Sequence, residues 1–161
     1  MRLLVLAVGH ARGNPEGSLS EDYVGRARAL GKRLGITSVT VEEVAVSKLR
    51  EAKSRIAEEG ERLAARVPPG AHVIFLDARG KGMTSEAFAE MLAAMRDAGA
   101  RDIVFMIGGP DGLDPGPAVK SSRSLAFGPQ TWPHLLVRAM LSEQIYRALT
   151  ILGGHPYHRG H

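Results

Sequence analysis

The sequence contains no cysteine, and aromatic residues make up only 5% of its 161 positions. Without thiols, disulfide bridges and thiolate metal sites are excluded, and nothing in the composition argues for an oxidising compartment. The apolar runs, such as residues 3–8, are far shorter than the roughly 20 residues of a membrane-spanning helix. The run at 3–8 is also too short to be the apolar part of a secretory signal peptide. We therefore expect a soluble, cytoplasmic protein that does not associate with membranes.

Two common nucleotide-binding motifs are also missing. No G-x-G-x-x-G follows a predicted strand, and no glycine stands five residues before Gly80 to make Gly80 and Lys81 part of a P-loop. His155, His158 and His161 have a spacing that imitates a metal site. No acidic residue stands near them in sequence to orient the imidazoles, so we expect no metal.

The positive charge is unevenly distributed along the chain. The net charge is +4, yet residues 1–114 carry 16 basic and 16 acidic residues, so the whole excess lies in residues 115–161. Four of the six histidines lie in the same C-terminal part. This placement indicates a surface for an anionic partner, with nucleic acid as the first candidate. An ordinary solvated face is the alternative.

Apolar runs rich in β-branched residues alternate with segments of helical periodicity. Strands are predicted at 2–8, 39–46, 72–77, 103–107 and 124–127. Helices are predicted at 18–35, 47–67, 85–99, 116–123 and 135–152. Ser18 with Glu21 resembles a capping box, while Ser47 and Thr84 or Ser85 are candidate N-caps. At this length the pattern favours one α/β domain over residues 1–161, with a mostly parallel sheet and helices on both faces.

Three predicted loops, at 77–83, 108–114 and 128–134, each follow a strand. In a parallel sheet such loops meet at the carboxyl edge, where ligands bind. Glycines in the second loop allow close approach to a ligand, although a simple tight turn is the alternative. Leu76, Phe127 and Trp132 add apolar walls that suit an adenine nucleoside. Trp132 also suits a core position or a dimer contact.

Several segments closely resemble the RlmH family of bacterial SPOUT-class methyltransferases, which methylate N3 of a pseudouridine in 23S ribosomal RNA. They are IGGPDGL at 107–113, TWPHLLVRAMLSEQIYRAL at 131–149, HPYHR at 155–159, LLVLAVG at 3–9 and FLDARGK at 75–81. The resemblance covers nearly the whole chain. It implies a C-terminal trefoil knot formed by about residues 72–161, a rare exception to the rule against knots. It further implies a homodimer, large-subunit ribosomal RNA as partner, and S-adenosylmethionine as cofactor.

The resemblance also assigns cofactor contacts to specific positions. They fall on Leu76, Gly108, Phe127, Gly128, Pro129, Gln130, Thr131 and Trp132. Family members usually carry serine-like residues where this chain has Gly128 and Pro129, so hydrogen bonds there must come from the backbone.

The C-terminal region supplies candidates for catalysis and RNA binding. N3 of pseudouridine becomes nucleophilic only as its proton leaves, so a base is needed, and His158 is the candidate because of its ordinary pKa. Tyr157 is a candidate for stacking on the extruded base, and Arg138 for stabilising the developing negative oxygen. The expected RNA contacts are Arg147, Arg159 and His155.

Alternatives remain for this region and for the function. Glu143, between Arg138 and Arg147, is interpreted as an intrahelical ion-pair partner in preference to a catalytic group. The tail at 153–161 is also compatible with a disordered terminus. A SPOUT methyltransferase acting on transfer RNA and a non-catalytic ribosome-assembly factor are the competing functions.

Overall fold

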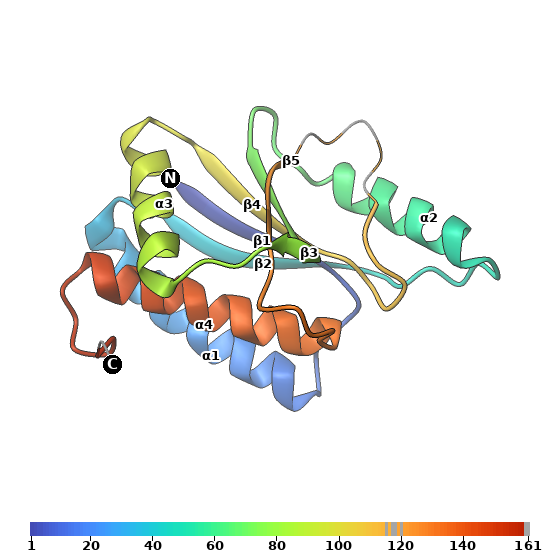
Figure 1. Ribbon diagram of the computed structural model, residues 1–161, viewed down its shortest axis with the longest axis horizontal. Coiled ribbons are helices and arrows are strands. Elements are labelled where there is room, and N and C mark those ends of the chain that lie inside the picture. Colours follow the sequence, from blue (N-terminus) through green and yellow to red (C-terminus); the bar gives the residue numbers. More distant parts are fainter. Residues whose placement is uncertain (115, 117–118, 120, 160–161) are drawn as a thin grey trace.

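The computed structural model describes residues 1–114, 116, 119 and 121–159, and its described strands form one parallel sheet (Figure 1). The strand order is β2-β1-β4-β3-β5. The strands are β1 (Arg2–Val8), β2 (Ser38–Val44), β3 (His72–Lys81), β4 (Asp102–Ile107) and β5 (Ser121–Leu125). The helices are α1 (Pro15–Gly31), α2 (Ala52–Ala64), α3 (Ser85–Asp97) and α4 (His134–Leu152), with a 3-10 turn at Lys32–Leu34. The predicted α/β class and parallel sheet are confirmed.

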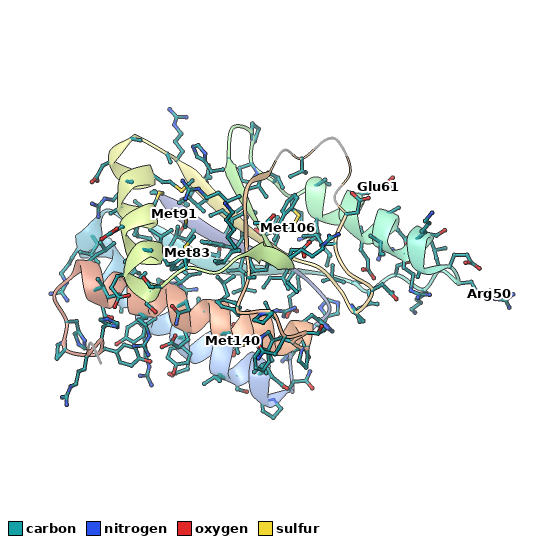
Figure 2. The ribbon with its side chains drawn as sticks, viewed as in Figure 1. Arg50, Glu61, Met83, Met91, Met106 and Met140 are labelled. Atoms are coloured by element: carbon teal, nitrogen blue, oxygen red, sulfur yellow. The ribbon has the colours of Figure 1, made fainter. Side chains whose placement is uncertain are left out.

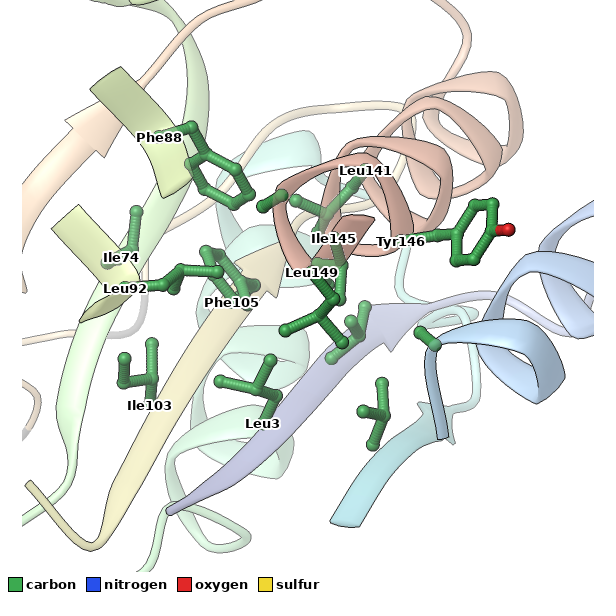
Figure 3. Packing of buried hydrophobic residues seen from close by; sticks show 14 of the residues in the cluster. Leu3, Ile74, Phe88, Leu92, Ile103, Phe105, Leu141, Ile145, Tyr146 and Leu149 are labelled. Carbon is green, nitrogen blue, oxygen red and sulfur yellow. The ribbon is translucent and has the colours of Figure 1, made fainter. Parts of the chain in front are cut away.

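Helices cover both faces of this sheet, as predicted. The larger core packs α1, α3 and α4 on one face, where Phe88 and Leu92 of α3 and Leu141 of α4 meet Phe105 of β4 (Figure 3). The smaller core contains Leu63 of α2 and apolar residues on the other face of the sheet. Every residue of β4 is buried, which explains why its sequence is a continuous apolar run.

Two helices begin at different residues from those predicted. Helix α1 starts at Pro15, with Asn14 as its N-cap, so the capping box at Ser18 is wrong. Proline fits the first helical turn because the amide it lacks would have no partner there. Helix α2 starts at Ala52, and the Ser47 amide donates to Glu59 Oε1 at 2.8 Å. The N-cap at Ser47 is therefore wrong, whereas Thr84 caps α3 by accepting from the Ala87 amide at 3.1 Å.

The sheet edge beyond β3 also differs from the prediction. Residues 121–123, expected at the end of a short helix, lie in β5 because they pair with β3. Residues 117, 118 and 120 of that expected helix lie outside the described residues. Strand β3 continues to Lys81, which pairs with Leu125, so the first five of the seven residues in the loop predicted at 77–83 are strand. Long-range pairing therefore outweighs the local signals of glycine and charge.

The chain crosses the molecule between its last strand and last helix. Strand β5 lies at one edge of the sheet, and α4 returns to pack along α1 and α3 (Figure 1). This path leaves the residues between Leu125 and His134 at the carboxyl edge of the sheet. The expected trefoil knot stays a prediction.

Candidate functional site

A cavity of about 920 Å³ opens at the carboxyl edge of the sheet. The predicted loops line it together, through residues 77–79, 108–109, 111–114, 127–128 and 130–132, with α2 along one side. This arrangement follows from the parallel sheet, because β3, β4 and β5 all end at the same edge. The volume lies within the range of small-molecule sites in proteins.

The expected cofactor residues gather around this cavity. Among the eight positions, those that line it are Leu76, Gly108, Phe127, Gly128, Gln130, Thr131 and Trp132. Pro129 belongs to the same loop but is not part of the wall. The Trp132 side chain is 39% exposed, so the alternative of a core residue is wrong. Its indole Nε1 donates to the Phe127 carbonyl at 2.9 Å, which fixes the loop against itself.

The turn after β4 requires glycine. A Cβ at Gly108 would lie 2.3 Å from the Gly112 carbonyl oxygen, and one at Gly109 would lie 2.8 Å from Glu59 Oε2. Gly112 has a φ of +116°, which side chains rarely adopt, and its amide donates to the Gly109 carbonyl at 3.1 Å. The turn is thus closed on itself and leaves its cavity face as bare backbone.

Two carboxylates at the rim of the cavity are held ionised by arginines. The hydrogen bond from Arg79 outweighs burial and lowers the pKa of Asp77, and the hydrogen bond from Arg55 likewise lowers the pKa of Asp111. Arg55 Nε lies 2.6 Å from Asp111 Oδ2, which ties α2 to the glycine turn. The rim therefore combines ion-paired carboxylates with apolar walls for a flat ring.

His134 is a cavity residue that the sequence reasoning missed. It is the first residue of α4 and lines the cavity. A Cβ on Gly9 would lie 3.1 Å from its Nε2, so the imidazole packs against the end of β1. Burial, and then the charge of Arg138, lower the pKa of His134, so the ring is neutral. In the sequence, His134 could have been found as the last residue of the TWPH segment, directly before the helix predicted at 135–152.

Arg138 does not reach this cavity. Its side chain is 1% exposed and pairs with Glu43, and its Nη2 donates to the carbonyls of Val8 at 3.2 Å and Gly9 at 2.8 Å. It lines a second cavity of about 850 Å³ near the start of α1. The arginine joins α4 to the end of β1, and its contact with substrate stays a prediction.

The partner of Arg138 is a strongly held carboxylate. Burial favours the neutral form of Glu43, but the Ala11 amide, His10 and Arg138 outweigh burial and lower its pKa. The Ala11 amide donates to Glu43 Oε1 at 2.9 Å, and His10 Nδ1 lies 2.9 Å from Oε2. Glu43 therefore connects the end of β2 with the residues that follow β1.

The candidate catalytic tail folds back beside α4. Tyr157 donates to Glu143 Oε1 at 2.9 Å, and His158 Nε2 lies 2.8 Å from Glu86 Oε1. Burial, and then hydrogen bonds to Tyr23 and Glu143, raise the pKa of Tyr157. None of the described tail residues lines the cavity of its own chain.

The expected RNA contacts lie around the same tail. Arg147 pairs with Glu143 at 2.6 Å, which confirms the intrahelical ion pair, and its guanidinium lies 4.9 Å from the centre of the Tyr157 ring. His155 is exposed, and its Nδ1 accepts from the Tyr157 amide at 3.2 Å. Arg159 is exposed. Their contacts with RNA stay predictions.

Neither a metal cluster nor a membrane span is found within the described residues. In the part of the chain that the structure describes, no three His, Asp or Glu side chains lie together as metal ligands. Within the same part, no helix is long and apolar enough to cross a bilayer.

An open parallel sheet with a nucleoside-sized cavity at its carboxyl edge defines a ligand-binding α/β protein. Comparison with known proteins narrows this class. A family model described as a predicted SPOUT methyltransferase matches residues 1–158. The chain belongs to the SPOUT methyltransferase family.

Close relatives share this length. A protein of Rhodopseudomonas palustris named ribosomal RNA large subunit methyltransferase H is 50% identical over 159 residues, covering 99% of both chains. A protein of the same name from Nitrobacter winogradskyi is 50% identical over 160 residues, covering 99% of this chain and all of its own. A solved structure of a probable methylase family protein from Haemophilus influenzae is more distant. Its TM-score is 0.47 at 15% identity, with 99% of this chain and 70% of that chain covered.

Proposed function

We propose that this chain is a methyltransferase that uses S-adenosylmethionine to methylate N3 of a pseudouridine in 23S ribosomal RNA of the assembled ribosome. The observation that carries the proposal is the cavity itself, whose wall includes seven of the eight positions that the family resemblance assigns to the cofactor. The names of the close relatives support the substrate class. Such an enzyme works in the cytoplasm, where ribosomes are.

The residues around the cavity fit this cofactor. Leu76, Phe127 and Trp132 offer apolar walls for an adenine ring, and the turn at Gly108 lets backbone amides and carbonyls approach a ligand. When bound, S-adenosylmethionine supplies an activated methyl group on a sulfonium.

The protein's own task is to position the acceptor and take its proton. Holding donor and acceptor in line contributes about 7 to 11 kcal/mol in well-oriented reactions. N3 of pseudouridine carries a proton, and we assign its removal to His158. Tyr157 would stack on the extruded base.

The position of the tail supports a homodimer as the working unit. Tyr157 and His158 pack against Glu143 and Glu86, and neither lines the cavity of its own chain. In a dimer packed through the predicted knot, the tail of a second copy would complete the cavity of the first. The catalytic histidine and the cofactor would then come from different chains.

The experiment that tests the function is transfer of labelled methyl from S-adenosylmethionine to ribosomes lacking the modification. Naked ribosomal RNA and bulk transfer RNA run beside them, and the nucleoside products are identified by mass. Methylated pseudouridine from ribosomes alone is the expected result. Label in transfer RNA would overturn the substrate but keep the cofactor, whereas cofactor binding without any transfer would favour an assembly factor.

A variant separates the two proposed roles of the tail and the cavity. His158→Ala should depress methyl transfer while cofactor affinity stays near that of the wild type. His72→Ala is the matched control, because His72 is exposed at the amino end of β3. Weaker cofactor binding in His158→Ala would contradict the assignment of His158 as base.

A further inference from the structure

The segment between β2 and α2 carries free positive charge beside the cavity. We call residues 46–53 the basic arm. Lys48, Arg50 and Lys53 are exposed, and no ion pair or hydrogen bond of their side chains is found among the described residues. Glu51 is the one acid in the arm. Lys53 lines the cavity. Arg50 comes just before the amino end of α2 and projects from the body of the protein (Figure 2).

The arm is held in place by buried and charged groups. Ser47 is 5% exposed, and its amide donates to Oε1 of the buried Glu59 at 2.8 Å. Arg55 Nη1 donates to the carbonyls of Leu49 at 3.1 Å and Arg50 at 2.7 Å. The same guanidinium holds Asp111 in the glycine turn. The backbone of the arm is thus fixed to the glycine turn beside the cavity. It therefore needs little further ordering when the arm binds a ligand.

Exposed apolar side chains alternate with these cations. Leu49 is 46% exposed and Val46 is 41% exposed, which places them among the few large apolar side chains on the surface. Cations bind phosphates, and apolar side chains cover ribose and base faces. This combination favours an RNA backbone over a purely acidic protein surface, which would not need the apolar contacts.

Two of the five C-terminal cations are committed to internal contacts. Arg138 is buried against Glu43, and Arg147 is paired with Glu143. Arg123 and Arg159 are exposed, and Lys120 lies outside the described residues. The positive charge that the C-terminal part presents is therefore smaller than its sequence indicates.

We propose that the basic arm binds the phosphate backbone of the RNA substrate and holds it beside the cofactor cavity. The proposal rests on the proposed function for its choice of RNA. Lys53 would bind next to the reacting nucleotide, and Lys48 and Arg50 would bind phosphates farther along the strand. Because phosphate contacts carry no sequence information, the arm positions the RNA and leaves the choice of base to the active site.

The test compares two triple variants that each remove three exposed cations. The arm variant is Lys48→Gln, Arg50→Gln and Lys53→Gln. Its matched control is Lys32→Gln, Arg33→Gln and Arg101→Gln, at the amino edge of the sheet, opposite the cavity. For both, ribosome affinity is measured by sedimentation across a salt series, together with cofactor affinity and the KM and kcat of methyl transfer.

The arm variant should bind ribosomes about tenfold or more weakly than the control, with the KM for ribosomes raised. Its plot of log affinity against log salt should be shallower by about 0.7 to 0.9 for each phosphate that the arm no longer neutralises. A double variant, Lys48→Gln with Arg50→Gln, should show the same changes in smaller degree. Because neither Lys48 nor Arg50 lines the cavity, the double variant should keep the cofactor affinity and the kcat of the wild type.

Equal ribosome affinity and equal salt dependence in the arm and control variants would overturn the proposal. So would a fall in ribosome affinity that does not depend on salt, which would indicate a protein contact. Ribosome affinity is measured without turnover. A wild-type chain that transfers no methyl, combined with weaker ribosome binding in the arm variant, would therefore refute the enzyme and keep the arm.

Discussion

Replacing Gly108 by alanine should deform the turn on which the cofactor cavity depends. The added Cβ would lie 2.3 Å from the Gly112 carbonyl oxygen and 2.6 Å from its carbonyl carbon, whereas ordinary contact begins at 3.4 Å. Both obstructing atoms belong to the backbone, so no side-chain rotation relieves the clash. The turn must open by about 1 Å, which is close to the displacement that costs about 10²-fold in well-oriented reactions.

The same clash sets the expected fall in stability. Overpacking of a closely packed site costs about 1 to 3 kcal/mol. For a chain of this length, 1 kcal/mol lowers the melting temperature by about 2 to 4 °C, so a fall of roughly 2 to 12 °C is expected. Cofactor affinity should fall by about tenfold or more, because the backbone groups of the turn move away from the ligand.

Calorimetric titration with S-adenosylmethionine and thermal unfolding measure the two effects. Gly82→Ala is the matched control, because a Cβ there would lie 3.8 Å from the Ala126 carbonyl, in ordinary contact. The control should bind and melt like the wild type. Wild-type affinity and melting temperature in Gly108→Ala would show that the turn can open freely, and the argument from close approach would fail.

Four further predictions concern stability. Because its hydrogen bonds and Arg138 outweigh burial and keep the pKa of Glu43 below 4.5, stability from this carboxylate should be complete above pH 4.5 and lost on acidification. Denaturant titrations from pH 6 to 3 should show this loss flattened in Glu43→Gln. Arg138→Ala should lower the free energy of unfolding by about 1 to 3 kcal/mol, since it leaves the carbonyls of Val8 and Gly9 without their donor; a change well below 1 kcal/mol in urea would contradict this role of the arginine. Leu92→Ala, at a fully buried core position, should cost about 2 to 5 kcal/mol in the same assay, whereas Tyr157→Phe should cost only about 1 kcal/mol.

The parts of the fold that the sequence predicts well are those decided by burial. Strand β4 is buried along its whole length, and β1 is buried except at Arg2, so both appear in the sequence as apolar runs. Strand β5 has the sequence SSRSL and forms through pairing with β3. A polar edge strand of this kind has no periodicity of its own, which is why the sequence suggests a helix over part of it.

Serine residues that resemble caps failed as predictors for a related reason. Ser18 and Ser47 both stand before helical periodicity, but a cap is defined by its hydrogen bonds. The Ser47 amide and hydroxyl are engaged by Glu59 and Glu58 of α2, which holds the chain extended until Glu51. Only the tertiary contact distinguishes a serine that starts a helix from one that anchors the segment before it.

For the candidate site, too, the sequence predicts the cavity but not the position of the C-terminal tail. The three loops could be placed at one edge because a parallel sheet requires it, whereas the position of His158 outside the cavity depends on its contact with Glu86 of α3. No local pattern in the sequence reports a contact between residues so far apart along the chain. The family resemblance gives the residues of the active site but not the chain that supplies each of them.

Charge counted along a sequence is not the charge that a partner meets. Residues 1–114 are balanced at 16 basic and 16 acidic residues, yet the basic arm within them exposes three cations with one acid. The C-terminal residues hold the whole excess, yet Arg138 and Arg147 are paired with Glu43 and Glu143. An ion pair cancels the field that a distant phosphate would feel, whereas an unpaired exposed cation retains it. RNA recognition by this domain should therefore depend on the arm beside the cavity more than on the terminus where the sequence concentrates its charge.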